Sequence, residues 1–69
     1  MSGTIRVNGE ERPLGATTVA GLLREESLDP QAPGIAVALN GAVVPRRAWA
    51  ATSIAQGDEV EIVKPFSGG

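Results

Sequence analysis

The beginning of the chain alternates polar and apolar residues. Residues 4–7, Thr-Ile-Arg-Val, place their two apolar side chains on one face, which is typical of a half-buried β-strand. Asn8-Gly9 follows and strongly favours a tight hairpin turn. A second strand is predicted over residues 10–14. Because Pro13 cannot donate to a strand ladder, we expect this strand at an edge of the sheet.

A helical spacing replaces this alternation in residues 17–26. The apolar positions recur at i, i+3 and i+4 from Val19, and polar residues fill the opposite face. Thr18 can cap the first turn. Gly21 weakens a helix interior by roughly 1 kcal/mol relative to alanine. We therefore expect packing against a sheet, rather than intrinsic propensity, to hold this helix.

The second half of the chain returns to a period of two. Residues 35–39 alternate Ile, Val and Leu with alanine, which predicts a central strand buried on one face and closely covered on the other. Asn40-Gly41 predicts a turn, and a short strand at residues 43–44 should end at Pro45. After a crossover, residues 59–63 alternate again and predict the last strand.

The predicted order is two strands, a helix and three strands. This order fits an α+β roll in which one main helix crosses a mixed sheet of about five strands, as in the β-grasp, or ubiquitin-like, fold. We expect residues 1–64 to form this domain and residues 65–69 to form a flexible C-terminal tail ending in Gly-Gly.

Composition narrows the possible functions. The 69 residues suit a single domain, and 42% hydrophobic with 20% charged residues argues against disorder. Cysteine and histidine are absent, which removes thiol and imidazole catalysis and the usual zinc ligands. Six Lys and Arg against eight Asp and Glu give a net charge of -2, so nucleic acid is not an expected partner.

Targeting signals are not evident. The first residues lack the charged start and apolar run of a signal peptide, and no stretch has the length of a membrane span. We expect a cytoplasmic protein that does not bind a membrane.

The final residues, Gly68 and Gly69, are the first candidate for chemistry. A carboxylate is a poor electrophile, but once joined to AMP it becomes an acyl adenylate that sulfur or nitrogen can attack. Glycine has no side chain to obstruct a narrow enzyme channel and accepts the backbone angles that a channel imposes. The ordinary alternative is a frayed chain end.

Two stretches carry a resemblance to a known family. "ALNGAVVPRRAWA" and the terminal "GDEVEIVKPFSGG" resemble the sulfur carrier proteins of thiamine biosynthesis, the ThiS family. Residues 44–49, Val-Pro-Arg-Arg-Ala-Trp, carry most of the weight, because the small subunits of molybdopterin synthase share the Gly-Asp and Gly-Gly features. The likeness extends over essentially the whole chain and is closest from Ala36 onward.

The resemblance implies a role as a protein cosubstrate rather than an enzyme. An E1-like adenylating enzyme of the ThiF type would use ATP to activate the Gly69 carboxylate, with no cofactor bound to the chain itself. Sulfur from cysteine, delivered through a cysteine desulfurase, would give a thiocarboxylate that a thiazole synthase of the ThiG type accepts. Gly68 would give clearance in the channel, and Ser67, Phe66 and Pro65 would lie where the tail enters a partner.

Other interpretations of the Gly-Gly end stay open on the residues alone. The chain could carry sulfur for molybdopterin or cysteine synthesis, or it could be a ubiquitin-like modifier joined to lysines through Gly69. It could also be a β-grasp interaction module with an inert tail.

Five further residues have mainly structural explanations. Trp49, the single tryptophan, is expected to close the core rather than bind a ligand. Arg46 and Arg47 are expected to form a solvated corner. Glu59 and Glu61 should face solvent on the outer side of the last strand, with a shared metal site as the lesser alternative.

Overall fold

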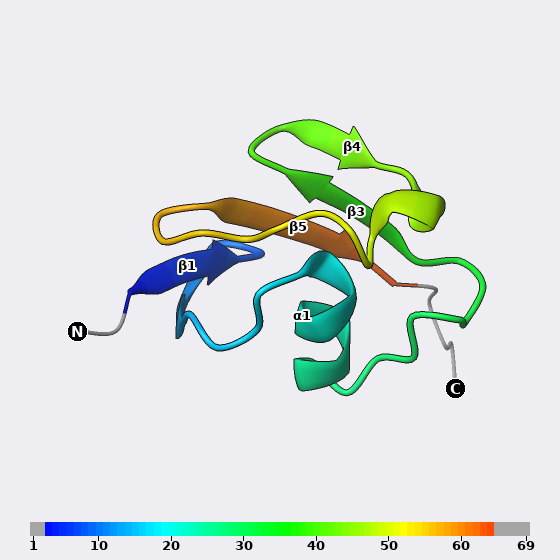
Figure 1. Ribbon diagram of the computed structural model, residues 1–69, viewed down its shortest axis with the longest axis horizontal. Helices are drawn as coiled ribbons and strands as arrows, with labels where there is room; N and C mark the ends of the chain where they lie inside the picture. The colour runs from blue at the N-terminus through cyan, green and yellow to red at the C-terminus, as the bar shows by residue number, and fades with distance from the viewer. Residues whose placement is uncertain (1–2, 65–69) are drawn as a thin grey trace.

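The computed structural model describes residues 3–64 (Figure 1). They form a five-stranded sheet in the order β2-β1-β5-β3-β4 and one α-helix. The elements are β1 (Thr4–Val7), β2 (Glu10–Pro13), α1 (Val19–Glu25), β3 (Ala36–Leu39), β4 (Ala42–Val44), a short 3₁₀ helix (Arg46–Ala48) and β5 (Glu59–Val63).

The last strand of the sequence is the middle strand of the sheet. β5 runs parallel to β1, with Arg6 opposite Glu59, and antiparallel to β3, with Ala36 opposite Val63. β2 lies at an edge, as the proline at position 13 predicted. The mixed sheet and its single helix give the α+β β-grasp fold that the order of elements predicted.

The first turn of α1 is tied to the crossover that precedes β5. Thr18 caps the helix as predicted, since its Oγ1 accepts a hydrogen bond from the Gly21 N–H at 3.1 Å. The N–H groups of Val19 and Ala20 donate to the carbonyl oxygens of Thr52 and Trp49, at 3.0 and 3.1 Å. The donors that a helix start leaves without an intrahelical partner are thus satisfied by the chain that packs beside it.

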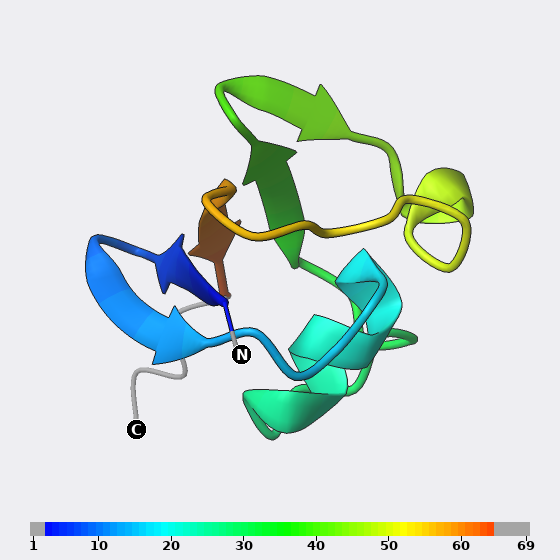
Figure 2. The ribbon, with the colours of Figure 1, turned by 60° about the vertical axis from the view of Figure 1, so that its left-hand side comes forward.

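The core lies between one face of the sheet and α1. Figure 2 shows the chain between the 3₁₀ helix and β5 passing between the β3–β4 hairpin and α1. Full burial of one leucine contributes about 1.5 to 3 kcal/mol, and Leu23 is fully buried. The buried residues are Ile5, Val7, Val19, Ala20, Leu22, Leu23, Ile35, Val37, Val44, Trp49, Ile54, Val60 and Ile62.

The outer face of the sheet differs from the prediction for residues 35–39. One face of β3 is buried through Val37, but the other face is not closely covered: Ala36 is exposed and Ala38 is half-buried. The reason is that α1 covers only one side of the sheet, and no second layer of the described residues packs against the outer face of β3. The alanines of β3 therefore lie on an open face of the sheet, and not on a face that another element covers.

Trp49 is buried in the core, with 3% of its surface exposed, as predicted. Arg46 and Arg47 are exposed, which also agrees with the prediction. The 3₁₀ helix that contains both arginines was not predicted. The sequence pattern indicated only a crossover between the strands at this point.

Candidate functional site

The sequence placed the candidate site in residues 65–69, and these residues lie outside the described part of the chain. The roles predicted for Pro65, Phe66, Ser67, Gly68 and Gly69 therefore stay predictions, as does the boundary between domain and tail. The structure does describe β5, the strand that leads to them, and the surface around its end.

The end of β5 is an interior position of the sheet. β4 and β5 both run antiparallel to β3, so both strands end at the same side of the sheet. Val44 at the end of β4 and Val63 at the end of β5 are separated by β3 alone. A partner that takes the residues after Lys64 would therefore approach β3 and β4 as well.

An apolar patch lies on the outer face beside this end. It consists of Ala36, Ala38, Val43 and Val63, which the strand register places on neighbouring positions of one face. Val43 is 78% exposed and Val63 is 63% exposed. The patch forms part of a shallow depression of about 320 Å³ whose lining also includes Glu61. Exposed apolar side chains gathered in one place usually mark a contact surface.

Sequence reasoning missed this apolar patch, although a signal was present. Residues 43 and 44 are both valine, and the last strand ends in Ile-Val. Consecutive apolar residues in a strand place one side chain on each face, so one of each pair had to lie outside the core.

The two acidic residues of β5 face solvent, as predicted. Glu59 and Glu61 are both exposed on the outer side of the strand. Within residues 3–64, no three or more acidic side chains gather in a way that could hold a metal ion. Glu61 instead places a carboxylate beside the apolar patch.

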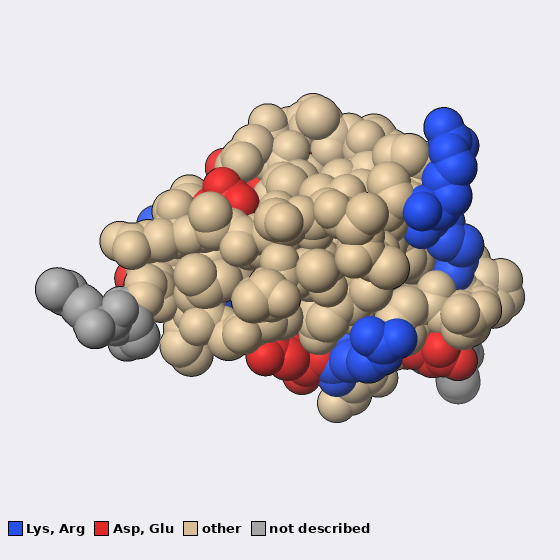
Figure 3. All heavy atoms as spheres, in the orientation of Figure 1, with Lys and Arg blue, Asp and Glu red and all other residues tan. Residues whose placement is uncertain are grey.

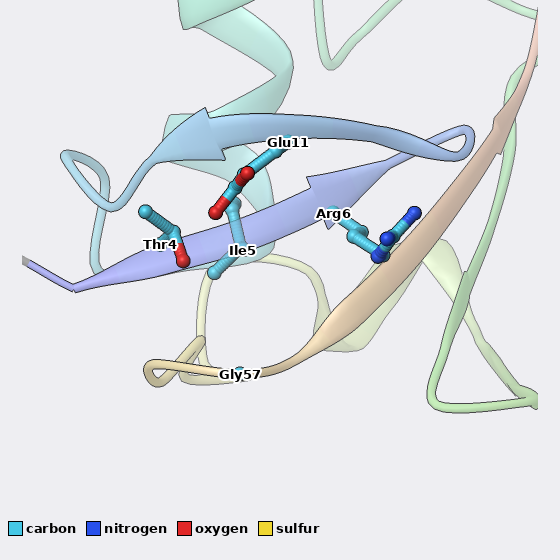
Figure 4. A pocket seen from close by; sticks show the side chains of 5 residues that line it. All are labelled: Thr4, Ile5, Arg6, Glu11 and Gly57. Atoms are coloured by element: carbon cyan, nitrogen blue, oxygen red, sulfur yellow. The ribbon is translucent and has the colours of Figure 1, made fainter.

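A second depression, of about 180 Å³, lies on β1 near the beginning of β5 (Figure 4). Thr4, Ile5, Arg6, Glu11 and Gly57 line it. The Arg6 guanidinium donates to the Gly9 carbonyl oxygen at 3.1 Å, so it is partly engaged. This hollow lies where β5 begins, since the Gly57 N–H donates to the Thr4 carbonyl oxygen at 2.8 Å, and is thus away from the end that leads to the tail.

An ion-pair cluster joins β2 to the end of the helix. Arg12 pairs with Glu10 at 3.0 Å and with Glu26 across the gap to α1. The hydrogen bond to Glu10 and the negative charge of Glu26 raise the pKa of Arg12 above its ordinary value. These groups and Lys64 line one depression, so the cluster lies beside the last described residue.

Most of the face seen in Figure 3 is uncharged, and the charged side chains form separate groups near its edges. Within residues 3–64, no helix is long and apolar enough to span a membrane.

The family comparison covers nearly all of the chain, including its last residues. The model of the ThiS family matches residues 5–69. The chain belongs to the ThiS family. This confirms the resemblance drawn from residues 36–69, and the matched positions extend to Gly68 and Gly69.

Solved structures of ThiS-type proteins have the same fold. The crystal structure of a thiamine biosynthesis protein (ThiS) from Geobacter metallireducens aligns with a TM-score of 0.77 and 36% identity, covering 96% of this chain and 99% of that chain. The NMR solution structure of a thiamine biosynthesis protein from the same organism gives a TM-score of 0.76 and 33% identity, covering 96% and 87%. A comparison with curated proteins found no match.

Proposed function

We propose that this protein carries sulfur for thiamine synthesis on its C-terminal carboxylate. Membership in the ThiS family supports the sulfur carrier role, and ThiS proteins are carriers rather than catalysts. The observation that carries the proposal is the family match over residues 5–69, because it includes the Gly68-Gly69 end as well as the β-grasp domain.

The chemistry follows from the poor reactivity of a carboxylate. A Gly69 carboxylate oxygen attacks the α-phosphate of ATP on an adenylating enzyme of the ThiF type, and pyrophosphate leaves. A persulfide that a desulfurase forms from cysteine then attacks the acyl carbon and displaces AMP, which gives an acyl disulfide. A thiol such as free cysteine cleaves its S–S bond, becomes part of a disulfide itself, and releases the thiocarboxylate. A thiazole synthase of the ThiG type takes the sulfur. The chain itself supplies the carboxylate and binds no cofactor.

The apolar patch is the surface that we assign to the adenylating enzyme. Val63 belongs to the strand that leads into the tail, and Val43 lies two strands away on the same face. An enzyme that draws in residues 65–69 must approach this end of β5, and covering the patch would remove its exposed apolar side chains from water. Glu61 beside the patch would favour a basic residue on the enzyme.

Intact mass spectrometry tests the proposal. The protein is incubated with ATP, a ThiF-type enzyme, a cysteine desulfurase and cysteine, and the expected product is heavier by the difference between one sulfur and one oxygen atom. A variant lacking Gly69 is the matched control and should show no such gain. Covalent conjugates to lysines of other proteins, with no thiocarboxylate, would instead indicate a protein modifier. An unchanged mass would contradict the carrier role.

A further inference from the structure

The strand that leads to the tail is left without a main-chain neighbour on one edge before it ends. Along the β1 edge, the N–H of Arg6 donates to the Asp58 carbonyl oxygen at 3.0 Å, and the N–H of Asn8 donates to the Val60 carbonyl oxygen at 2.9 Å. Backbone groups of alternate residues point to the same edge of a strand, so Ile62 is next in this series. The chain has by then turned away at Asn8-Gly9.

The side chain of Asn8 takes the place of the missing peptide group. Its Oδ1 accepts a hydrogen bond from the Ile62 N–H at 2.7 Å, and its Nδ2 donates to the Ile62 carbonyl oxygen at 3.1 Å. A carboxamide carries a donor and an acceptor side by side, as a peptide group does. Asn8 lies in the left-handed region, with a φ of 52°, as the turn requires.

The second Asn-Gly turn binds the opposite edge of β5 at its other end. The N–H of Asn40 donates to the Glu59 carbonyl oxygen at 2.7 Å, and its Oδ1 accepts from the Glu59 N–H at 2.8 Å. Its φ is 51°. Two asparagines in equivalent turns thus hold β5, Asn40 at the beginning and Asn8 near the end.

We propose that Asn8 is a positioning residue that fixes the point from which the activated tail begins. Among the described residues, Asn8 makes the last contact on the β1 edge of β5, because Val63 pairs with Ala36 on the β3 edge. This inference rests on the proposed function, in which the carboxylate of Gly69 must meet ATP. Asn40, which binds the beginning of β5, would by contrast have a purely structural role.

The position of the end of β5 matters because it sets how far the terminal carboxylate can reach. A strand that slips by one residue moves its end by about 3.3 Å, and it also turns every side chain to the other face. A misplacement of about 1 Å at a reacting atom can lower a rate a hundredfold. Holding both polar groups of Ile62 keeps the register of β5 constant close to the tail, so that the reach of the last residues is constant as well.

Matched variants Asn8→Gly and Asn40→Gly test the role. Glycine accepts the positive φ of both turns, so each variant removes one carboxamide without straining the backbone. By NMR, amide hydrogen exchange should accelerate at Ile62 in Asn8→Gly and at Glu59 in Asn40→Gly. Both variants should lose some thermal stability, because each breaks two side-chain hydrogen bonds: Asn8→Gly loses both bonds to Ile62, and Asn40→Gly loses one to the Glu59 N–H and one to the Asp58 carboxylate.

The functional measurement is ATP–pyrophosphate exchange catalysed by a ThiF-type enzyme, with the carrier as the varied substrate. Asn8 also lines the depression that contains the apolar patch, but its removal leaves the four residues of the patch unchanged. Asn8→Gly should therefore lower kcat by about tenfold to a hundredfold with a much smaller change in KM, because the carboxylate is misplaced while the apolar contacts are kept. Asn40→Gly should keep a kcat close to that of the parent. Asn8→Asp, which has the same shape but no Nδ2 donor, should also lower kcat and serves if the glycine variant folds poorly.

Equal kcat values for Asn8→Gly and Asn40→Gly would overturn the positioning role. So would an amide hydrogen exchange rate at Ile62 that is the same in Asn8→Gly as in the parent. A parent protein that supports no pyrophosphate exchange would overturn the proposed function and this role together. The amide exchange measurement would then still report whether Asn8 holds β5.

Discussion

The guanidinium carbon of Arg46 lies 4.6 Å from the centre of the Trp49 ring. The indole Nε1 donates to the carbonyl oxygen of Val44 at 2.8 Å. Arg46 also donates to the carbonyl oxygens of Pro30 and Ala32, the second at 2.6 Å. The stretch that carries most of the resemblance to the ThiS family is therefore a structural unit: it folds on itself and holds the loop that precedes β3.

Trp49→Ala should lower the free energy of unfolding by about 3 to 5 kcal/mol. The indole is buried, and its removal leaves both a cavity and the Val44 carbonyl oxygen without its partner. This is a large share of the stability of so small a domain. Denaturant unfolding followed by circular dichroism measures the loss. A variant that unfolds like the parent yet fails to receive sulfur would show that Trp49 is a functional residue.

Arg46→Ala should cost about 1 to 2 kcal/mol, because it removes the stacking on Trp49 and two hydrogen bonds to exposed carbonyl groups. Arg47→Ala is the matched control. Arg47 follows Arg46 in the 3₁₀ helix and is also exposed, and surface substitutions of this kind usually change stability by less than about 0.5 kcal/mol. Equal unfolding midpoints for the two variants would mean that the contacts of Arg46 add nothing to stability.

Much of the fold was predictable from local pattern alone. The alternation at residues 59–63 gave the last strand with its observed bounds, and Thr18 marked the observed helix cap. Pro13 indicated the edge strand because its missing N–H is a local property that needs no knowledge of the partner strand.

The failures depend on contacts between distant parts of the chain. The alanines of residues 35–39 fit either an open face or a covered one, and only the position of the helix decides between them. The contacts of Asn8 with Ile62 and of Arg46 with Ala32 join residues far apart in sequence. The candidate site was predicted from a chemical requirement at the chain end. The consecutive apolar residues at positions 43–44 and 62–63 indicated that some apolar side chains lie outside the core, but only the strand register brings them together in one patch.

Val43→Lys should weaken the complex with a ThiF-type enzyme by about 1 to 2 kcal/mol, since the apolar patch loses an exposed contact residue. The change in stability should be small, because Val43 is on an edge strand, where lysine is well tolerated. Thr4→Lys, on the same face but on β1, is the matched control. Isothermal titration calorimetry compares them, and equal affinities for both variants would remove the patch from the interface.

Phe66→Ala should weaken binding to the adenylating enzyme or the thiazole synthase by about 1 to 2 kcal/mol while the fold stays largely intact. Phe66 is the single phenylalanine and follows the last strand closely in sequence, where an apolar side chain would serve a partner contact. Binding and thermal unfolding are measured on the same sample. A large loss of thermal stability with unchanged binding would instead place Phe66 in the packing of the domain.

Gly68→Val should greatly slow adenylation while leaving the melting temperature almost unchanged. A β-branched side chain narrows the permitted backbone angles and adds bulk where a channel must admit the chain. Deleting Gly69 should have a similar effect, because the new terminal carboxylate stops about 3.5 Å short of the position that the parent reaches. Exchange of labelled pyrophosphate into ATP measures this step. If both variants exchange as fast as the parent, the carboxylate of Gly69 is not the group that is activated, since neither its position nor its approach would then matter to the reaction.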